Sequence, residues 1–195
     1  MIAFIDGEVV TADPTRVVVL SHGIGYELKI SLQTYSILKI GETLRLYTQL
    51  ILRENDIQLY GFQSIAEKQL FNSLISVSGI GGNTALTMLS KLPLHELSAV
   101  INNGNLATLK SIKGIGEKTA ARIILELQGK LVLPTNALGG ANNTVQLSSI
   151  RLDSITALVN LGFPRVTMEK IVDQILAKNP QLAVDEVIKI ALQNR

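Results

Sequence analysis

The sequence of 195 residues contains no cysteine and no tryptophan, and it has only two histidines. The absence of cysteine excludes disulfide bonds, thiolate catalysis and cysteine-ligated zinc. The two imidazoles, His22 and His95, lie far apart in the sequence and neither adjoins an acidic cluster, so we expect no metal site and no cofactor. These absences remove several classes of enzyme before any motif is considered.

Charged residues are also scarce, at 17% of the chain, and the formal net charge is +2 at pH 7. A chain with so little net charge has no strong overall positive field, so any affinity for nucleic acid must arise from a local cluster of basic groups. Aromatic residues make up only 4% of the sequence. That scarcity argues against a single-strand binder that stacks bases on aromatic side chains.

No long hydrophobic run is free of polar residues. Residues 69–90 carry no charge, but they include asparagine, serine, threonine and several glycines, which argues against a membrane span. The first ten residues have no cationic segment and are interrupted by Asp6 and Glu8, unlike a secretory signal peptide. We therefore expect a cytoplasmic protein with no membrane contact.

Four segments differ in their hydrophobic period. Residues 1–62 contain five short runs rich in β-branched and aromatic residues, separated by turn signals, and predict a small closed β-barrel such as an OB-fold. Residues 63–133 follow the helical period and predict an all-α domain. Residues 134–149 have neither charge nor apolar period and predict a flexible linker, whereas residues 150–195 show three helical stripes and predict a three-helix domain. The predicted fold class is α+β with several domains.

An internal repeat lies in the first helical segment. The tripeptide Gly-Ile-Gly occurs at residues 79–81 and again, 35 residues later, at residues 114–116. Residues 63–133 also hold seven lysines and arginines against four acids, the largest positive excess among the three predicted domains. One such tripeptide is compatible with an ordinary turn between helices, whereas two copies in the most basic domain favour a shared function.

The chemistry of the repeat suits a phosphate group. The two glycines allow the backbone a positive φ and leave no Cβ between the turn and a ligand, while Ile80 or Ile115 can anchor the turn in the core. Backbone N–H groups at the start of the following helix have no intrahelical acceptor, and the helix dipole favours an anion there. The repeat therefore predicts two clamps that hold the DNA backbone without reading bases.

Several segments resemble one known family. The stretches SVSGIGGNTAL and SIKGIGEKTAARIILEL are similar to the paired helix-hairpin-helix motifs of the RuvA family of Holliday-junction branch-migration proteins. HGIGYEL, LRENDIQLYGF and LVNLGF are similar to motifs in that family's first and third domains. The resemblance covers nearly the whole chain apart from the linker. It implies an OB-fold barrel at residues 1–62, an all-α tandem helix-hairpin-helix domain at residues 63–133 and a three-helix, UBA-like domain at residues 150–195.

The resemblance implies that both glycine turns contact phosphates. Some relatives have lysine where this chain has Asn83 and Glu117, so the cationic contribution is smaller here, and Lys113 can compensate in part. The residues implied to contact phosphate are Gly79, Ile80, Gly81, Gly82, Asn83, Lys113, Gly114, Ile115, Gly116, Lys118, Thr119 and Arg122.

A short acidic turn, Glu54-Asn55-Asp56, separates two predicted strands. By itself it is typical of a solvated β-turn. The resemblance implies an acidic pin that faces the junction crossover at the centre of a tetramer, where carboxylates repel phosphates. Glu54 matches the family's first acid, but the second position is Asn55 and Asp56 is shifted by one residue. The predicted pin residues are Glu54 and Asp56, and whether Asp56 faces DNA stays open.

The resemblance also implies partners. The third domain would dock the hexameric ATPase RuvB through Leu161 and Phe163, although both are equally compatible with core positions. Four chains would form a homotetramer, or an octamer of two tetramers, on four-way junction DNA, with the resolvase RuvC as a further partner. The implied context is branch migration in homologous recombination, DNA repair and the SOS response to DNA damage.

Two hypotheses of enzymatic function, a DNA glycosylase or lyase and a nucleotide-binding protein, do not fit the residues at specific positions. A helix-hairpin-helix DNA glycosylase or lyase would place a catalytic lysine at Lys118 and an aspartate about eighteen residues later, where this chain has Asn136. A nucleotide-binding loop needs glycine directly before Lys-Thr, but Glu117 occupies that position. The sequence therefore predicts a non-catalytic DNA-binding protein with no catalytic residue of its own.

Overall fold

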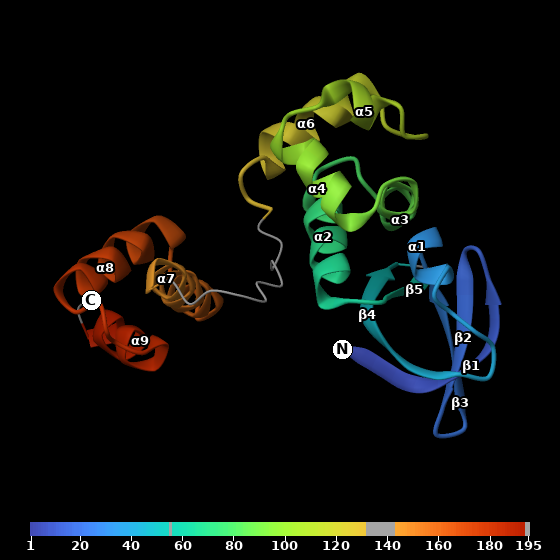
Figure 1. Ribbon diagram of the computed structural model, residues 1–195, viewed down its shortest axis with the longest axis horizontal. Helices are drawn as coiled ribbons and strands as arrows, with labels where there is room; N and C mark the ends of the chain where they lie inside the picture. The colour runs from blue at the N-terminus through green and yellow to red at the C-terminus, as the bar shows by residue number, and fades with distance from the viewer. Residues whose placement is uncertain (55, 132–142, 194–195) are drawn as a thin grey trace. The chain divides into compact units, whose positions relative to one another are not determined.

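The computed structural model describes residues 1–54, 56–131 and 143–193. Contacts divide the chain into two compact units, residues 1–135 and residues 136–195. In the first unit, a β-barrel lies next to a group of helices (Figure 1). The change of hydrophobic period near residue 62 therefore marks a change of secondary structure inside one compact unit.

Five strands close into a barrel in the order β1-β2-β3-β5-β4. All neighbouring strands pair antiparallel except β3 and β5, which are parallel. Val9, Val19, Leu28 and Leu46 are fully buried inside it, as the alternation of side chains along a strand requires. The strands are β1 (Phe4–Asp13), β2 (Arg16–Ser21), β3 (Ile24–Lys29), β4 (Thr43–Arg53) and β5 (Asp56–Phe62).

Two local features shape the barrel. His22 and Gly23 both have positive φ, 48° and 82°, and form the two-residue turn between β2 and β3, a geometry that matches the twist of paired strands. A short helix, α1 (Leu32–Tyr35), connects β3 to β4. The sequence did not predict α1, because four residues are too few to show a helical period.

Helices α2 to α6 pack around one hydrophobic core that the barrel also enters. Tyr60 and Phe62 of β5 are fully buried in this core, with ring centroids 4.9 Å and 4.8 Å from that of Phe71 in α2. The barrel and the helices are thus held together by shared apolar packing. The helices are α2 (Ile65–Ser76), α3 (Gly82–Lys91), α4 (Leu94–Asn102), α5 (Leu106–Lys110) and α6 (Glu117–Leu127).

A buried carboxylate adds a polar connection between the barrel and α2. Glu67 is only 3% exposed and accepts hydrogen bonds from Ser31 Oγ at 2.7 Å, Thr34 Oγ1 at 3.1 Å and the Gln63 N–H at 3.1 Å. Burial raises the pKa of the Glu67 carboxyl, and these hydrogen bonds act against that rise. Because Ser31 and Thr34 belong to the barrel side, the carboxylate ties α1 to the first turn of α2.

The second unit contains three helices, α7 (Asn143–Asn160), α8 (Arg165–Lys178) and α9 (Val184–Gln193). Ile155, Leu158, Val172 and Val187 form its buried core. Arg151 of α7 also makes a bidentate ion pair with Asp173 of α8. The predicted fold class, an OB-fold barrel, a tandem helix-hairpin-helix region and a three-helix domain, is confirmed.

The structure differs from the predicted linker in one part. Residues 143–149, which the composition assigned to a flexible linker, belong to α7. Extending an existing helix costs far less than nucleating one, so the packed segment around Ile155 can carry the helix back into a stretch without apolar period. The rest of the predicted linker, residues 134–142, lies outside the described residues.

Among the described residues, no helix is long and apolar enough to cross a bilayer. Nor do three acidic or histidine side chains in the described part of the chain gather closely enough to hold a metal ion.

Candidate nucleic-acid interface

The first glycine turn connects α2 to α3. Gly79 has φ of +94°, a left-handed conformation that side chains rarely adopt, and the Ile80 N–H donates to the Val77 carbonyl at 3.1 Å. The Ile80 side chain is 6% exposed and belongs to the helical core. Ile80 therefore anchors the turn through its buried side chain, and its N–H is already engaged within the turn.

The second turn, between α5 and α6, repeats this geometry closely. Gly114 has φ of +90°, and the Ile115 N–H donates to the Ile112 carbonyl at 3.0 Å. Ile115 is 5% exposed and lies in the same core cluster as Ile80. The two turns are structural copies, and a common core fixes their relative position.

The second glycine of each tripeptide differs from the expectation of positive φ. Gly81 and Gly116 are extended, with φ/ψ of −93°/170° and −83°/171°. Any residue can adopt this conformation. A Cβ at Gly116 would meet no atom within 4 Å, and one at Gly81 would meet only Arg53 Nη2 at 3.5 Å. Neither backbone strain nor internal packing requires glycine at these two positions, and the absent Cβ leaves the backbone open to an approaching ligand.

Gly81 and Gly116 are also the N-cap residues of α3 and α6, and neither helix start has a side-chain cap. The first helical hydrogen bonds run from Ala85 N–H to the Gly81 carbonyl at 3.0 Å and from Ala120 N–H to the Gly116 carbonyl at 2.9 Å. The N–H groups of residues 82–84 and 117–119 precede those bonds and have no acceptor within the helix. Both helix starts therefore offer donors to an anion.

Arg122 connects α6 to the first turn. Its Nη1 donates to the Ser78 carbonyl in that turn at 3.1 Å. The side chain is otherwise exposed to solvent. One donor of a side chain that the sequence predicted to contact phosphate is thus engaged within the protein.

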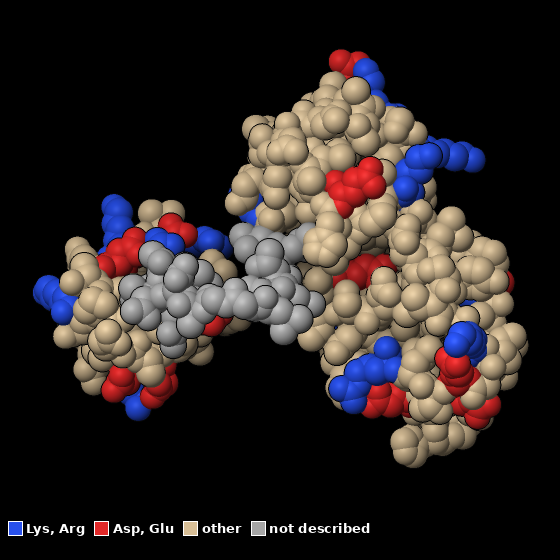
Figure 2. Space-filling model, in the orientation of Figure 1, with Lys and Arg blue, Asp and Glu red and all other residues tan. Residues whose placement is uncertain are grey.

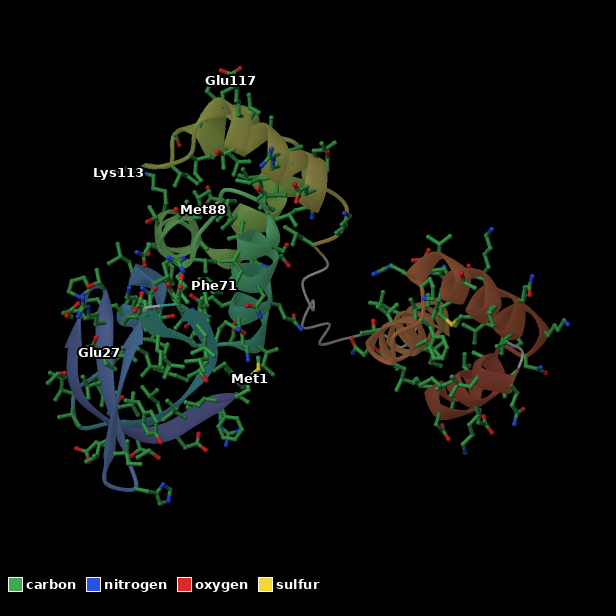
Figure 3. All side chains as sticks on the ribbon, turned by 180° about the vertical axis from the view of Figure 1, so that it is seen from behind. Met1, Glu27, Phe71, Met88, Lys113 and Glu117 are labelled. Carbon is green, nitrogen blue, oxygen red and sulfur yellow. The ribbon has the colours of Figure 1, made fainter. Side chains whose placement is uncertain are left out.

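The cationic groups around the turns come from several elements. Lys113 and Lys118 are exposed and Thr119 is half-buried. Glu117 forms an ion pair with Lys110 at 3.0 Å, which offsets its negative charge at the start of α6. Lys113 and Glu117 lie at the outer edge of the helices, away from Phe71 and Met88 in the core (Figure 3). On the face seen in Figure 2 most of the first unit is uncharged, and basic and acidic side chains appear both at its helical end and on the barrel.

The acidic turn places its two acids differently. Glu54 is exposed at the end of the β4–β5 hairpin. Asp56, the first residue of β5, accepts a hydrogen bond from Gln58 Nε2, and Gln58 Oε1 accepts one from the Tyr60 hydroxyl. Asp56 is therefore engaged along its own strand, whereas Glu54 has no side-chain hydrogen bond among the described residues. Asn55 lies outside them.

This chain of hydrogen bonds ends beneath the first glycine turn. A Cβ at Gly82 would lie 2.3 Å from the Tyr60 hydroxyl oxygen, so glycine at this position is needed for packing. Burial raises the pKa of the Tyr60 hydroxyl. Gly82, which the resemblance placed among the phosphate ligands, thus also has a packing role against Tyr60 that the sequence did not predict. The alternation of Asp56, Gln58 and Tyr60 along one strand face was the available signal.

The predicted docking residues lie in the second unit. Leu161 is 62% exposed and precedes Gly162, which has φ of +94° in the turn between α7 and α8. Phe163 is half-buried and packs against the core of the three helices. Leu161 is thus an exposed apolar side chain, and Phe163 is largely a structural one.

Family models match three parts of the chain. Residues 1–61 match the family model described as RuvA N terminal domain, residues 71–129 the SAM-like helix-hairpin-helix tandem, and residues 150–194 the RuvA C-terminal domain.

Curated relatives match over the full length. A protein of Flavobacterium psychrophilum is 43% identical over 194 residues, covering 100% of both chains. Proteins of Parabacteroides distasonis and Bacteroides fragilis are 44% and 41% identical, over 99% of each chain. All three are named Holliday junction branch migration complex subunit RuvA. The chain therefore belongs to the RuvA family.

Proposed function

We propose that this protein binds four-way junction DNA as a homotetramer and loads a RuvB-type hexameric ATPase for branch migration. The observation that carries the proposal is the pair of matching glycine turns, each leading into a helix start without a side-chain cap, on one shared core. Two such starts can each bind a backbone phosphate and together recognise shape in preference to sequence. The names of the full-length relatives support the same activity.

The proposed phosphate ligands are the backbone amides of both turns, supplemented by Lys113, Lys118 and Arg122. Four chains would place eight turns on the four arms, and two tetramers could enclose one junction as an octamer. In this proposal the chain itself is non-catalytic, ATP hydrolysis belongs to the RuvB-type partner, and strand cleavage belongs to a RuvC-type resolvase.

The decisive experiment compares a four-way junction with a duplex of equal length in a gel-shift titration. We expect tighter binding of the junction, because only branched DNA engages the turns of all four chains. If a tetramer neutralises about 8 phosphates, log K should fall with log salt concentration with a slope of about −7. Equal affinity for the two DNA forms would refute junction recognition, and a nearly flat salt response would refute the phosphate clamps.

The role of the uncapped helix starts is tested by Gly116→Asn. Asparagine is a preferred N-cap, fits the extended backbone at this position and leaves the net charge unchanged. Its side chain would accept hydrogen bonds from the amides that a phosphate needs. We expect an unchanged or raised melting temperature together with roughly tenfold weaker binding to junction DNA, the range of a lost charge-assisted hydrogen bond.

Gly114→Ala is the matched control for Gly116→Asn. Because Gly114 has φ of +90°, alanine there should lower the free energy of unfolding by about 1 kcal/mol while leaving the helix start uncapped. A folded Gly116→Asn protein that binds junctions like the wild type would show that these amides do not hold DNA.

The acidic turn is tested by comparing Glu54→Gln with Asp56→Asn. A carboxylate about 8 Å from a phosphate costs roughly 0.5 kcal/mol in water and about 2 kcal/mol at an effective dielectric of 20. We expect Glu54→Gln to tighten binding to ordinary duplex, and Asp56→Asn to have the smaller effect because Asp56 is bonded to Gln58. Unchanged or weaker duplex binding by Glu54→Gln would remove the pin from the proposal.

We further propose that the second unit docks the ATPase through the exposed Leu161. Leu161→Asp should abolish stimulation of a RuvB-type ATPase on junction DNA and leave DNA binding intact, because the turns lie in the other unit. Gln181→Asp introduces the same charge at another exposed position of the second unit and serves as the control. Full stimulation by Leu161→Asp would contradict this docking residue.

A further inference from the structure

A groove of about 730 Å³ separates the barrel from α3. Arg16 of β2 and Lys29 of β3 line its barrel side, and Asn83, Thr87 and Ser90 line its α3 side. Lys113, from the second glycine turn, completes the lining. The groove therefore begins at the start of α3, where the first turn ends, and also reaches a residue of the second turn.

The groove is built from fixed parts. Ser90 Oγ accepts a hydrogen bond from the Leu32 N–H at 2.9 Å, which ties α3 to α1 of the barrel. Lys29 Nζ lies 3.5 Å from Asn83 Oδ1, across the mouth of the groove. Leu86 and Ile30, both buried, contribute apolar surface. These contacts join residues more than 50 positions apart, so the groove depends on the packing of α3 against the barrel.

The charge of the groove has one sign. No acidic side chain lines it, and its three cationic groups are Arg16, Lys29 and Lys113. Arg16 is paired with Glu27 outside the lining at 3.2 Å, while both side chains remain more than half exposed. Lys29 and Lys113 have no ion pair among the described residues, so the groove retains a net positive charge.

The positive charge of the groove lies beside the start of α3, which has no charged side chain. The first turn of α3 begins with Gly82, Asn83 and Thr84, so it carries no basic side chain. The Asn83 carboxamide oxygen instead holds the ammonium group of Lys29 close to this turn. Lys29 of the barrel thus places a positive charge beside the first glycine turn, which has no basic residue at the start of its helix. The apolar part of the lysine side chain can lie along the wall of the groove.

We propose that the groove binds the phosphodiester backbone of the DNA arm that the first glycine turn holds, with Lys29 as the main phosphate-binding side chain. The proposal rests on the proposed DNA-binding function and extends it from the helices onto the barrel. Lys113 contributes at the end near the second turn, and Arg16 contributes less because Glu27 offsets its charge. The contact is electrostatic and independent of base sequence.

The experiment measures binding of Lys29→Gln to a four-way junction and to duplex DNA across a salt series. We expect about threefold to tenfold weaker binding to both DNA forms, and a salt slope smaller in magnitude by about 0.9 for each chain that loses the contact. Lys39→Gln is the matched control, because Lys39 is an exposed lysine of the same barrel that does not line the groove. It should bind with the affinity and salt slope of the wild type.

A rescue variant separates a charge effect from a structural one. In the Lys29→Gln background, Asn83→Lys places an ammonium group near the position that Lys29 Nζ occupies in the wild type. We expect it to restore both affinity and salt slope. If Lys29→Gln fails to fold, as judged by its melting temperature, Arg16→Gln, which lines the groove and belongs to neither glycine turn, should show a smaller loss of the same kind.

The outcomes distinguish this proposal from the general function. A wild-type protein that prefers junctions, with Lys29→Gln matching it in affinity and salt slope, would overturn the groove and leave the glycine clamps standing. A wild-type protein without junction preference would overturn junction binding, whereas the difference between Lys29→Gln and Lys39→Gln on duplex would still test the groove. Loss of affinity without rescue by Asn83→Lys would show that Lys29 does not act at a phosphate near the first turn.

Discussion

The central feature of the first unit is the set of backbone N–H groups at the starts of α3 and α6, which no side chain caps. A helix start usually carries a serine, threonine or aspartate whose side chain satisfies the first N–H groups. Glycine at residues 81 and 116 leaves those groups without a side-chain acceptor, although neither backbone strain nor internal packing demands glycine there. An external anion can accept hydrogen bonds from these N–H groups, and phosphate is an anion that a helix start binds readily.

Two phosphate-binding helix starts can distinguish one DNA shape from another only if the distance between them is constant. Ile80 and Ile115 pack in one core, and Arg122 of α6 donates to the Ser78 carbonyl, so the two turns belong to one packed body. The barrel is bound to that body by the Tyr60 ring under α3 and by the buried Glu67 carboxylate. Because β5 runs from the acidic turn to Tyr60, one strand sets the position of Glu54 relative to the first glycine turn.

The distribution of charge follows from the low net charge of the chain. Lys110 is paired with Glu117, and Arg16 is partly offset by Glu27. Lys29 contacts the neutral side chain of Asn83 and keeps its charge. Positive charge is therefore concentrated at a few positions. A protein of this kind would hold phosphates by hydrogen-bond geometry first and by charge second.

The sequence by itself determined the elements and the chemistry of the turns. The change from β-branched runs to a helical period predicted the barrel and the helical regions, and the Gly-Ile-Gly repeat predicted the two turns with positive φ at Gly79 and Gly114. These properties are local, because a period or a dihedral requirement is written in a few adjacent residues. The sequence did not predict helix α1 or the first turns of α7. Helix α1 is too short to show a helical period, and the start of α7 has no apolar stripe.

Only the tertiary structure decided how distant residues meet. The extended backbone of Gly81 and Gly116, the bond that engages Asp56, the seat of Tyr60 beneath Gly82 and the approach of Lys29 to Asn83 had no complete sequence signal. Lys29 and Asn83 are 54 residues apart. Their contact exists because apolar packing sets α3 against the barrel, and the geometry of that packing depends on the whole core and not on any one segment.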